Sequence, residues 1–245
     1  MSTDHYIIHS PYQHITTLQY HNMVFLVILL LLVTLGALGL LFTVLTKFSP
    51  GEKRIQEALK KMQADMDTWT EELVPIDRKE LELFSLTQIK NSIKKRFTTS
   101  GKGIYTTIFE EPIVAYSYKR YLGKNAHALL YCRTAEHEYA YWIRPKGVQV
   151  VIDNKLVGTY KDNGVLYSAG SKKMIARLNR DEKKITPVVI GEREVASMVK
   201  SLPAAKDDLS ARAFQFVRED LTEEEEKLLL SISLLEMVQG SVGEK

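Results

Sequence analysis

Residues 23–46 have the sequence MVFLVILLLLVTLGALGLLFTVLT, with no charged residue, no Asn or Gln and no Pro. A helix over this stretch is about 36 Å long, enough to cross a hydrocarbon core of about 30 Å. A cleaved signal peptide is the main alternative, but its apolar region is shorter and follows basic residues. Residues 1–22 contain no Lys or Arg. The stretch therefore predicts one transmembrane helix that stays in the protein.

The Lys and Arg residues near this helix all lie on its C-terminal side. Lys47, Lys53, Arg54, Lys60 and Lys61 follow it within fifteen residues. Such an excess marks the cytoplasmic flank of a membrane helix. We therefore expect a single-pass protein of the cell (inner or plasma) membrane, with residues 1–22 as an extracytoplasmic tail and residues 47–245 in the cytoplasm. The lone cysteine is consistent with a reducing compartment.

The chain as a whole is mixed in charge and not strongly basic. It contains 33 Lys and Arg against 30 Asp and Glu, a formal net charge of +3. This balance does not predict a nucleic-acid partner. The part after the helix is long enough to bury a core of its own.

Several residues in and before the transmembrane helix are candidates for contacts inside a membrane. Gly36, Gly39 and Thr43 are small residues at three- and four-residue steps, a spacing that lets a partner helix approach closely. Such residues are also common in membrane helices without a partner. His21, at the mouth of the helix, could ligate a haem- or chlorophyll-type metal, but the spacing of the N-terminal histidines matches no compact metal site. We therefore predict no bound cofactor or metal.

We interpret residues 47–100 as a helical linker next to the membrane. Residues 49–52, Ser-Pro-Gly-Glu, resemble a helix start, and an apolar stripe follows up to Trp69. Pro75 ends this helix, and a second helix is expected from about Arg78 to Arg96. The basic residues at its end are candidates for contact with anionic lipid headgroups. They are Lys94, Lys95 and Arg96.

Residues 101–245 form a β domain in this interpretation. Short β-rich runs alternate with turn residues about every ten positions, which predicts an antiparallel barrel or sandwich. The expected strands are 104–109, 113–120, 128–133, 139–143, 148–152, 156–160, 165–168, 174–178, 185–190, 193–199 and 213–217.

The C-terminal helix is apolar on almost every face. Thr222 and Glu225 form a capping box at its start, and Leu or Ile residues follow at nearly every position from Leu228 to Leu235. A helix that is apolar all round must be buried or lie in lipid, and this one is short for a membrane span. We therefore predict that the strands surround it. The predicted fold is thus a transmembrane helix, juxtamembrane helices, and an all-β antiparallel barrel or sandwich with a buried C-terminal helix.

This order of elements resembles the tubby-like superfamily, which includes phospholipid scramblases and LURP-one proteins. The resemblance covers roughly 101–240 and includes the hairpin VQVVIDNKLVGTYKDNGVLYS (148–168) and the terminal FQFVREDLTEEEEKLLLSISLLEMV (214–238). It implies a barrel of ten to twelve strands threaded by the terminal helix, and binding of phosphoinositides or action at membranes. It assigns no binding residue here. A PH-like domain is the competing fold, with fewer strands and an amphipathic helix.

Candidates for catalysis are few. The chain contains no P-loop and no Gly-x-Gly-x-x-Gly after a strand. Cys132 lies near His127 and His137 in sequence, but its apolar run Ala-Leu-Leu-Tyr-Cys favours a buried core residue. Residues 136–138, Glu-His-Glu, lie in a predicted hairpin turn. We therefore expect no catalytic site.

Two functions remain after this reading. The first is a non-catalytic accessory or structural subunit of a larger membrane protein complex, such as a respiratory or photosynthetic complex. The partners of such a subunit are other membrane subunits, which it contacts through the transmembrane helix. The second is a membrane-tethered lipid- or ligand-binding module of tubby-like type, whose partners are anionic lipid headgroups.

Overall fold

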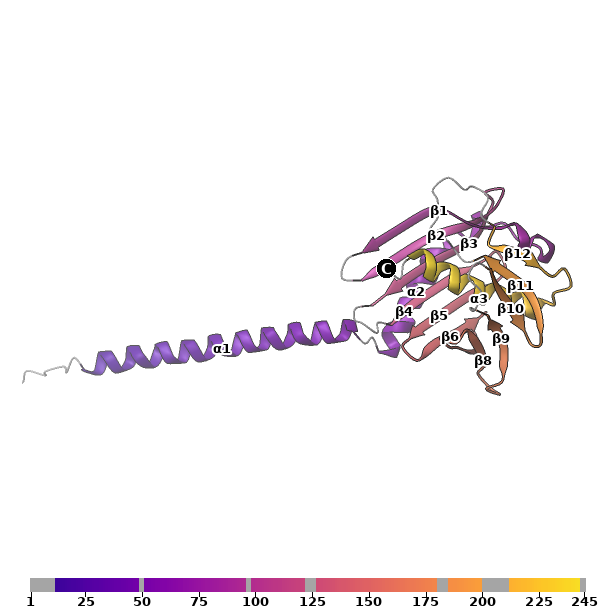
Figure 1. Ribbon diagram of the computed structural model, residues 1–245. Coiled ribbons are helices and arrows are strands. Elements are labelled where there is room, and N and C mark those ends of the chain that lie inside the picture. Colours follow the sequence, from indigo (N-terminus) through magenta and orange to yellow (C-terminus); the bar gives the residue numbers. More distant parts are fainter. Residues whose placement is uncertain are drawn as a thin grey trace, which may run out of the picture. The chain divides into compact units, whose positions relative to one another are not determined.

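The computed structural model describes residues 12–48, 51–95, 98–121, 127–179, 185–199 and 212–242, and within the first helix the side chains of residues 23–42. The chain divides into two compact units, Met1–Lys47 and Phe48–Lys245. We call the second unit the β domain. Figure 1 shows both units.

The first unit contains the helix α1, Tyr12–Phe48. Within it, Met23–Phe42 is long and apolar enough to span a membrane, and none of that segment is buried within the protein. It is the one such helix among the described residues. The length and composition of α1 therefore agree with the predicted anchor, and Thr43 and His21 lie in the helix on either side of this segment.

The β domain begins with the helix α2, Glu52–Asp67, and two 3₁₀ turns, η1 (Thr70–Glu72) and η2 (Arg78–Leu83). A sheet of twelve strands follows, in which each strand pairs antiparallel with the next in sequence. The strands are β1 (Phe84–Lys95), β2 (Thr99–Thr107), β3 (Pro112–Arg120), β4 (Ala128–Arg133), β5 (Glu138–Arg144), β6 (Gly147–Ile152), β7 (Lys155–Tyr160), β8 (Val165–Ser168), β9 (Met174–Leu178), β10 (Ile185–Ile190), β11 (Arg193–Val199) and β12 (Phe214–Val217). The helix α3, Glu223–Val242, ends the described chain.

The sheet is a nearly closed barrel. Its first and last strands approach each other where Ser85 bridges Arg212 and the Ala213 N–H donates to the Phe84 carbonyl at 2.7 Å. The sheet curves around α3, as Figure 1 shows. Almost the whole apolar surface of α3 is buried, and the Tyr141 hydroxyl of β5 donates to the Ser231 carbonyl of α3 at 2.7 Å. Of the predicted antiparallel barrel or sandwich with a buried C-terminal helix, the structure has the nearly closed barrel form.

A smaller apolar cluster lies on the outer face of the sheet, where α2 packs over β3 and β4. Ile55, Met62 and Met66 of α2 are buried against outward-facing residues such as Leu129 and Tyr131. Asp67, at the end of α2, pairs with Arg133 at the end of β4 at 3.1 Å. The apolar stripe predicted for this helix therefore faces the barrel.

The second predicted helix, Arg78–Arg96, is wrong. Its residues Arg78–Leu83 form η2 and Phe84–Lys95 form β1, the first strand of the barrel. Phe84 belongs to the inner core, whereas Ile89 packs on the outer cluster. Register shifts interrupt the pairing of β1 with β2, and Lys90 has a positive φ of 51°. This bulge shifts the two-residue alternation after Ile89, so Phe84, Ile89 and Ile93 do not keep one strand period. Residues Phe84–Lys95, which the sequence pattern places in the helical linker, therefore belong to the barrel.

Candidate functional site

The antiparallel order of the strands gives the barrel two ends. The connections β1–β2, β3–β4, β5–β6 and β7–β8 lie at one end, which we call the β1–β2 end. The connections β2–β3, β4–β5 and β6–β7 lie at the other, the β2–β3 end. The pairing register defines the β1–β2 end as a continuous line, in which Thr99 pairs with Arg120, Arg120 with Ala128, Ala128 with Ile143, and Ile143 with Val148.

The direction of α2 can be assigned relative to these ends. Arg54, in its first turn, lies close enough to Tyr121 for its charge to offset part of the rise in the pKa of that tyrosine. Tyr121 directly follows β3. Asp67, its last residue, contacts Arg133 at the far end of β4. Gln63 donates to Glu138, where β5 begins, at 3.1 Å. The helix α2 therefore starts at the β1–β2 end and ends toward the β2–β3 end.

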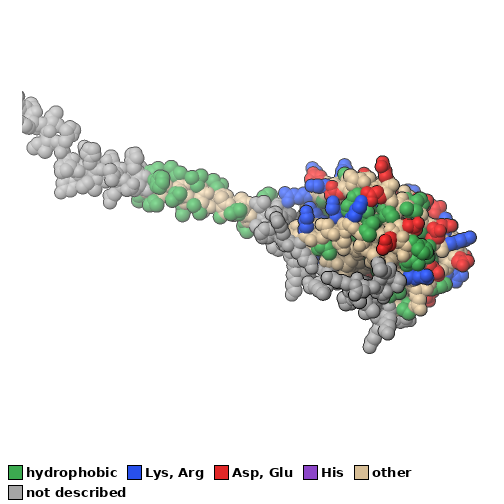
Figure 2. All heavy atoms as spheres, turned by 90° about the horizontal axis from the view of Figure 1, so that it is seen from above, with side chains coloured by type: hydrophobic (Ala, Val, Ile, Leu, Met, Phe, Trp, Pro, Cys, Tyr) green, Lys and Arg blue, Asp and Glu red, His purple; other side chains and the backbone are tan. Residues whose placement is uncertain are grey.

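Basic side chains outnumber acidic ones, such as Asp162 and Glu236, at the β1–β2 end. The Lys and Arg residues that the structure describes there, on α2 and on the strand ends and turns, are Lys53, Arg54, Lys94, Lys119, Arg120, Arg144, Lys146 and Lys161. Figure 2 shows several Lys and Arg side chains close together on one side of this domain, and Asp and Glu side chains mixed with further Lys and Arg on the other. Burial lowers the pKa of Lys119, and the positive charge of the nearby Lys61 adds to this shift.

An aromatic side chain lies within this basic group. The indole N–H of Trp142 donates to Nδ1 of His127 at 3.1 Å, and the two ring centroids are 6.0 Å apart. The guanidinium of Arg144 lies 4.7 Å from the centre of the Trp142 ring, a cation–π geometry. Burial and the charge of Arg144 lower the pKa of His127. We call these three residues the Trp142 cluster.

A second aromatic–cation pair lies next to it. The ammonium of Lys119 is 5.2 Å from the ring centre of Tyr121, and the Tyr121 N–H donates to the His127 carbonyl at 2.8 Å. Burial raises the pKa of Tyr121. Tyr and Trp beside Lys and Arg are the residues that proteins place at a membrane–water interface.

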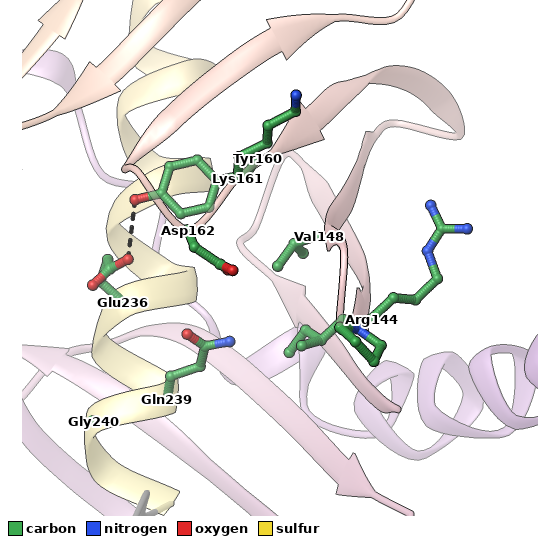
Figure 3. A pocket seen from close by; sticks show the side chains of 10 residues that line it. Arg144, Val148, Tyr160, Lys161, Asp162, Glu236, Gln239 and Gly240 are labelled. Carbon is green, nitrogen blue, oxygen red and sulfur yellow. Dashed lines mark hydrogen bonds between the residues drawn. The ribbon is translucent and has the colours of Figure 1, made fainter. Parts of the chain in front are cut away.

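A cavity of about 520 Å³ opens at the same end, between the last turns of α3 and the turns after β5 and β7. The Tyr160 hydroxyl donates to Glu236 of α3 at 3.1 Å across its wall. Figure 3 shows that the charged ends of Arg144 and Lys161 extend away from Tyr160, Glu236 and Gln239. These two cations therefore point away from the α3 side of the cavity.

The β2–β3 end is rich in carboxylates. The helix α3 begins there with Glu223–Glu226, and its capping box is formed: the Thr222 N–H donates to the Glu225 carboxylate at 2.9 Å, and the Glu225 N–H to the Thr222 hydroxyl at 3.3 Å. Arg193 contacts the same carboxylate at 2.6 Å. These contacts anchor α3 and β11 together, so we assign them to stability.

The residues singled out in the sequence fall into separate parts of the structure. Lys94 and Lys95 lie in β1 at the β1–β2 end, and Arg96 lies outside the described residues. A Cβ atom at Gly36 or Gly39 of α1 would meet no atom within 4 Å. The side chains of Thr43 and His21 are not among those described.

The candidates for chemistry are separated from one another. Cys132 is buried in the barrel core, and burial raises the pKa of its thiol well above the usual value. His127 bonds Trp142, whereas His137 bonds Asp153 at 3.0 Å in the turn at the opposite end. Among the described residues, His, Cys, Asp and Glu side chains form no group of three or more that could hold a metal ion.

The Trp142 cluster was missed by sequence reasoning. Trp142 and Arg144 are two positions apart on β5, so alternation places them on one face. His127 lies fifteen residues earlier and reaches them through the β4–β5 pairing. A Trp-x-Arg pair at the end of a predicted strand was the available signal.

Comparison of the chain with family models, with curated proteins and with solved structures found no match.

Proposed function

We propose that this chain is a single-pass membrane protein whose β domain docks on the anionic surface of the membrane that α1 crosses. The function is binding and not catalysis, and the docking surface is the β1–β2 end of the barrel. Support for the anchor comes from the apolar segment Met23–Phe42. The excess of Lys and Arg after this segment supports a cytoplasmic β domain.

The observation that carries the proposal is the direction of α2. Only residues 49–51 lie between the end of α1 and the start of α2. Extended chain covers at most about 3.6 Å per residue, so this connection reaches about 14 Å. The first turn of α2 lies at the β1–β2 end of the barrel. If α1 spans the membrane, this short connection would tether the start of α2 near the headgroups, which supports docking through the basic end.

The charge of this end fits an anionic lipid surface. Each Lys or Arg near such a surface contributes about 1 kcal/mol, and the contribution falls within a Debye length of about 10 Å. The twelve-strand meander around a C-terminal helix is also the arrangement implied by the resemblance to the tubby-like superfamily. That resemblance supports action at membranes, although it assigns no residue.

The proposal is tested by measuring which end of the barrel approaches the lipid. The full chain in nanodiscs receives a donor fluorophore on a cysteine at Lys146, in the β5–β6 turn, and energy transfer to a labelled headgroup is measured. The control carries the cysteine at Lys155, where β7 begins at the other end. Cys132 stays in place because it is buried.

We expect Lys146→Cys to show the higher transfer efficiency, more so with about 30% phosphatidylserine and less at high salt. Equal transfer from Lys146→Cys and Lys155→Cys, with no dependence on lipid charge, would refute docking. A charge-swapped variant, Lys119→Glu with Lys146→Glu, carries the fluorophore on a cysteine at Pro145 in the same turn and should lose the lipid dependence.

A second candidate is the accessory subunit of a membrane complex. The observation that favours it is the apolar surface of α1, in which none of Met23–Phe42 is buried and a side chain at Gly36 or Gly39 would meet open space. Extraction in mild detergent followed by mass spectrometry tests it: a stoichiometric partner that is lost in Gly39→Leu supports a helix contact. A free monomer in the detergent extract would refute this candidate and leave the docking proposal unaffected.

A further inference from the structure

The docking surface contains one group whose charge changes between neutral and mildly acidic pH. Resting on the proposed function, we propose that the Trp142 cluster is a proton-sensitive lipid anchor within that surface. Neutral His127 holds the indole of Trp142 through a hydrogen bond. Protonation of His127 releases the indole N–H and adds a positive charge beside Arg144, so that the cluster binds anionic headgroups more strongly.

The hydrogen bond assigns the neutral form of His127. Trp has one polar hydrogen and no acceptor, so the 3.1 Å contact between indole Nε1 and imidazole Nδ1 requires a lone pair on Nδ1. A protonated imidazole is a donor at both nitrogens and cannot keep this contact. Titration of His127 therefore breaks a defined bond and frees the one polar group of the indole.

The freed groups suit a phospholipid headgroup. An indole has an apolar body and one donor, and such side chains settle at the level of the headgroups. The guanidinium of Arg144 already lies over the ring, 4.7 Å from its centre, and can bind a phosphate through two parallel hydrogen bonds. Imidazolium at His127 would add a second cationic donor to the same phosphate. The ligand class is thus an anionic or zwitterionic phosphate headgroup.

The surroundings of His127 make its titration depend on the membrane. From β5 it faces Arg144, whose charge disfavours the imidazolium. From β3 it meets Tyr121, which donates to its carbonyl and carries Lys119 over its ring. From α2, the positive charge of Arg54 offsets part of the rise in the pKa of Tyr121. An anionic surface offsets these positive charges, so lipid binding and proton binding strengthen each other.

The test uses the full chain with Trp69→Phe in nanodiscs built on a tryptophan-free scaffold protein, so that Trp142 is the only fluorescent tryptophan. Its quenching by headgroup-proximal brominated lipid is followed from pH 8 to about pH 5, across the range of histidine titration. The nanodiscs contain phosphatidylcholine alone or with about 30% phosphatidylserine. His127→Asn keeps an acceptor oxygen near the position of Nδ1 but does not titrate. His137→Asn, in the turn at the β2–β3 end, is the matched control.

We expect quenching to rise at least about twofold as the pH falls, as it would when a titrating histidine gates the contact. The midpoint should lie about half a pH unit higher with phosphatidylserine, which corresponds to a surface potential of about −30 mV. His137→Asn should behave as the parent, and the quenching in His127→Asn should not change with pH.

The same pH response in His127→Asn would overturn the inference. Salt-sensitive docking without any pH response would also overturn it, and would leave the proposed function standing. Loss of all dependence on lipid charge in the parent would refute the proposed function and the inference with it. Thermal unfolding of each variant establishes that the β domain is folded.

Discussion

The position of α3 inside the barrel makes a quantitative prediction about Leu234. Its side chain is fully buried in the main core, between the sheet and the helix axis. Leu234→Ala removes three buried carbon atoms and leaves a cavity that a closed sheet can fill only in part. Substitutions of this kind cost about 2–5 kcal/mol. We take about 3 kcal/mol as the expected loss in the free energy of unfolding.

The matched control is the same substitution at Leu156. This leucine is 51% exposed on β7, so Leu156→Ala should cost only about 0.5–1 kcal/mol. Urea unfolding of the full chain in mild detergent measures both. The tryptophan emission reports on the β domain, because Trp69 and Trp142 are the only tryptophans in the chain. With a slope of about 2 kcal/mol per molar urea, Leu234→Ala should lower the midpoint by about 1.5 M.

Equal midpoints for Leu234→Ala and Leu156→Ala would refute the buried position of α3. A helix that lay on the outside of the barrel, or in lipid, would not distinguish the two leucines. A change of slope in Leu234→Ala alone would instead indicate that the barrel no longer unfolds in one step.

Two further predictions concern β7 and the start of α3. A Cβ atom at Gly158 would lie 1.9 Å from the Tyr167 carbonyl oxygen on β8, so Gly158→Ala should destabilise the barrel by about 3 kcal/mol or more. A Cβ atom at Gly170 would meet no atom within 4 Å, so Gly170→Ala should change the stability by less than about 0.5 kcal/mol in the same urea assay. Arg193 holds the pKa of Glu225 at about 2, below its usual 4.5, so the stability from this pair is complete above about pH 4.5 and is lost as the pH falls toward 2. Urea midpoints measured across this range should fall less steeply in Arg193→Gln, and an identical slope would contradict the assignment.

Most of the barrel could be predicted because its strands carry their signals locally. From β3 to β11, short runs rich in β-branched and aromatic residues end at turn residues, and the observed bounds lie close to the predicted ones. The turn at Asp153 and Asn154 has the positive φ angles that these residues tolerate. The burial of α3 was predictable for a different reason: a short helix that is apolar all round requires a surrounding layer.

The strand β1 could not be predicted from its local pattern. Its apolar residues alternate between the two faces of the sheet until the bulge at Lys90 shifts the alternation. Phe84, Ile89 and Ile93 therefore follow no single two-residue repeat along the strand. What decides the outcome is the pairing with β2, a contact between segments that sequence periodicity does not contain.

The candidate site was predictable only in its charge. Lys94 and Lys95 were candidates for headgroup contact because of their local run, and they do lie at the β1–β2 end. The larger basic group was not predicted, because Arg54, Arg120 and Arg144 stand on three different elements. The bond between His127 and Trp142 depends on the pairing of β4 with β5, so no spacing within one segment reveals it.

The barrel has a basic end and an acidic end, which the net charge of +3 does not reveal. The reason is that the connections of a meander alternate between its two ends. The turn 145–146 and the residues beside it are basic, the turn 108–111 before it in the chain is acidic, and an average along the sequence cancels them. The proposed docking depends on the connection between α1 and α2, since residues 49–51 reach only about 14 Å. Under this proposal, lengthening the connection with a flexible Gly-Ser insert should weaken docking without changing the barrel, and unchanged energy transfer from Lys146→Cys would count against it.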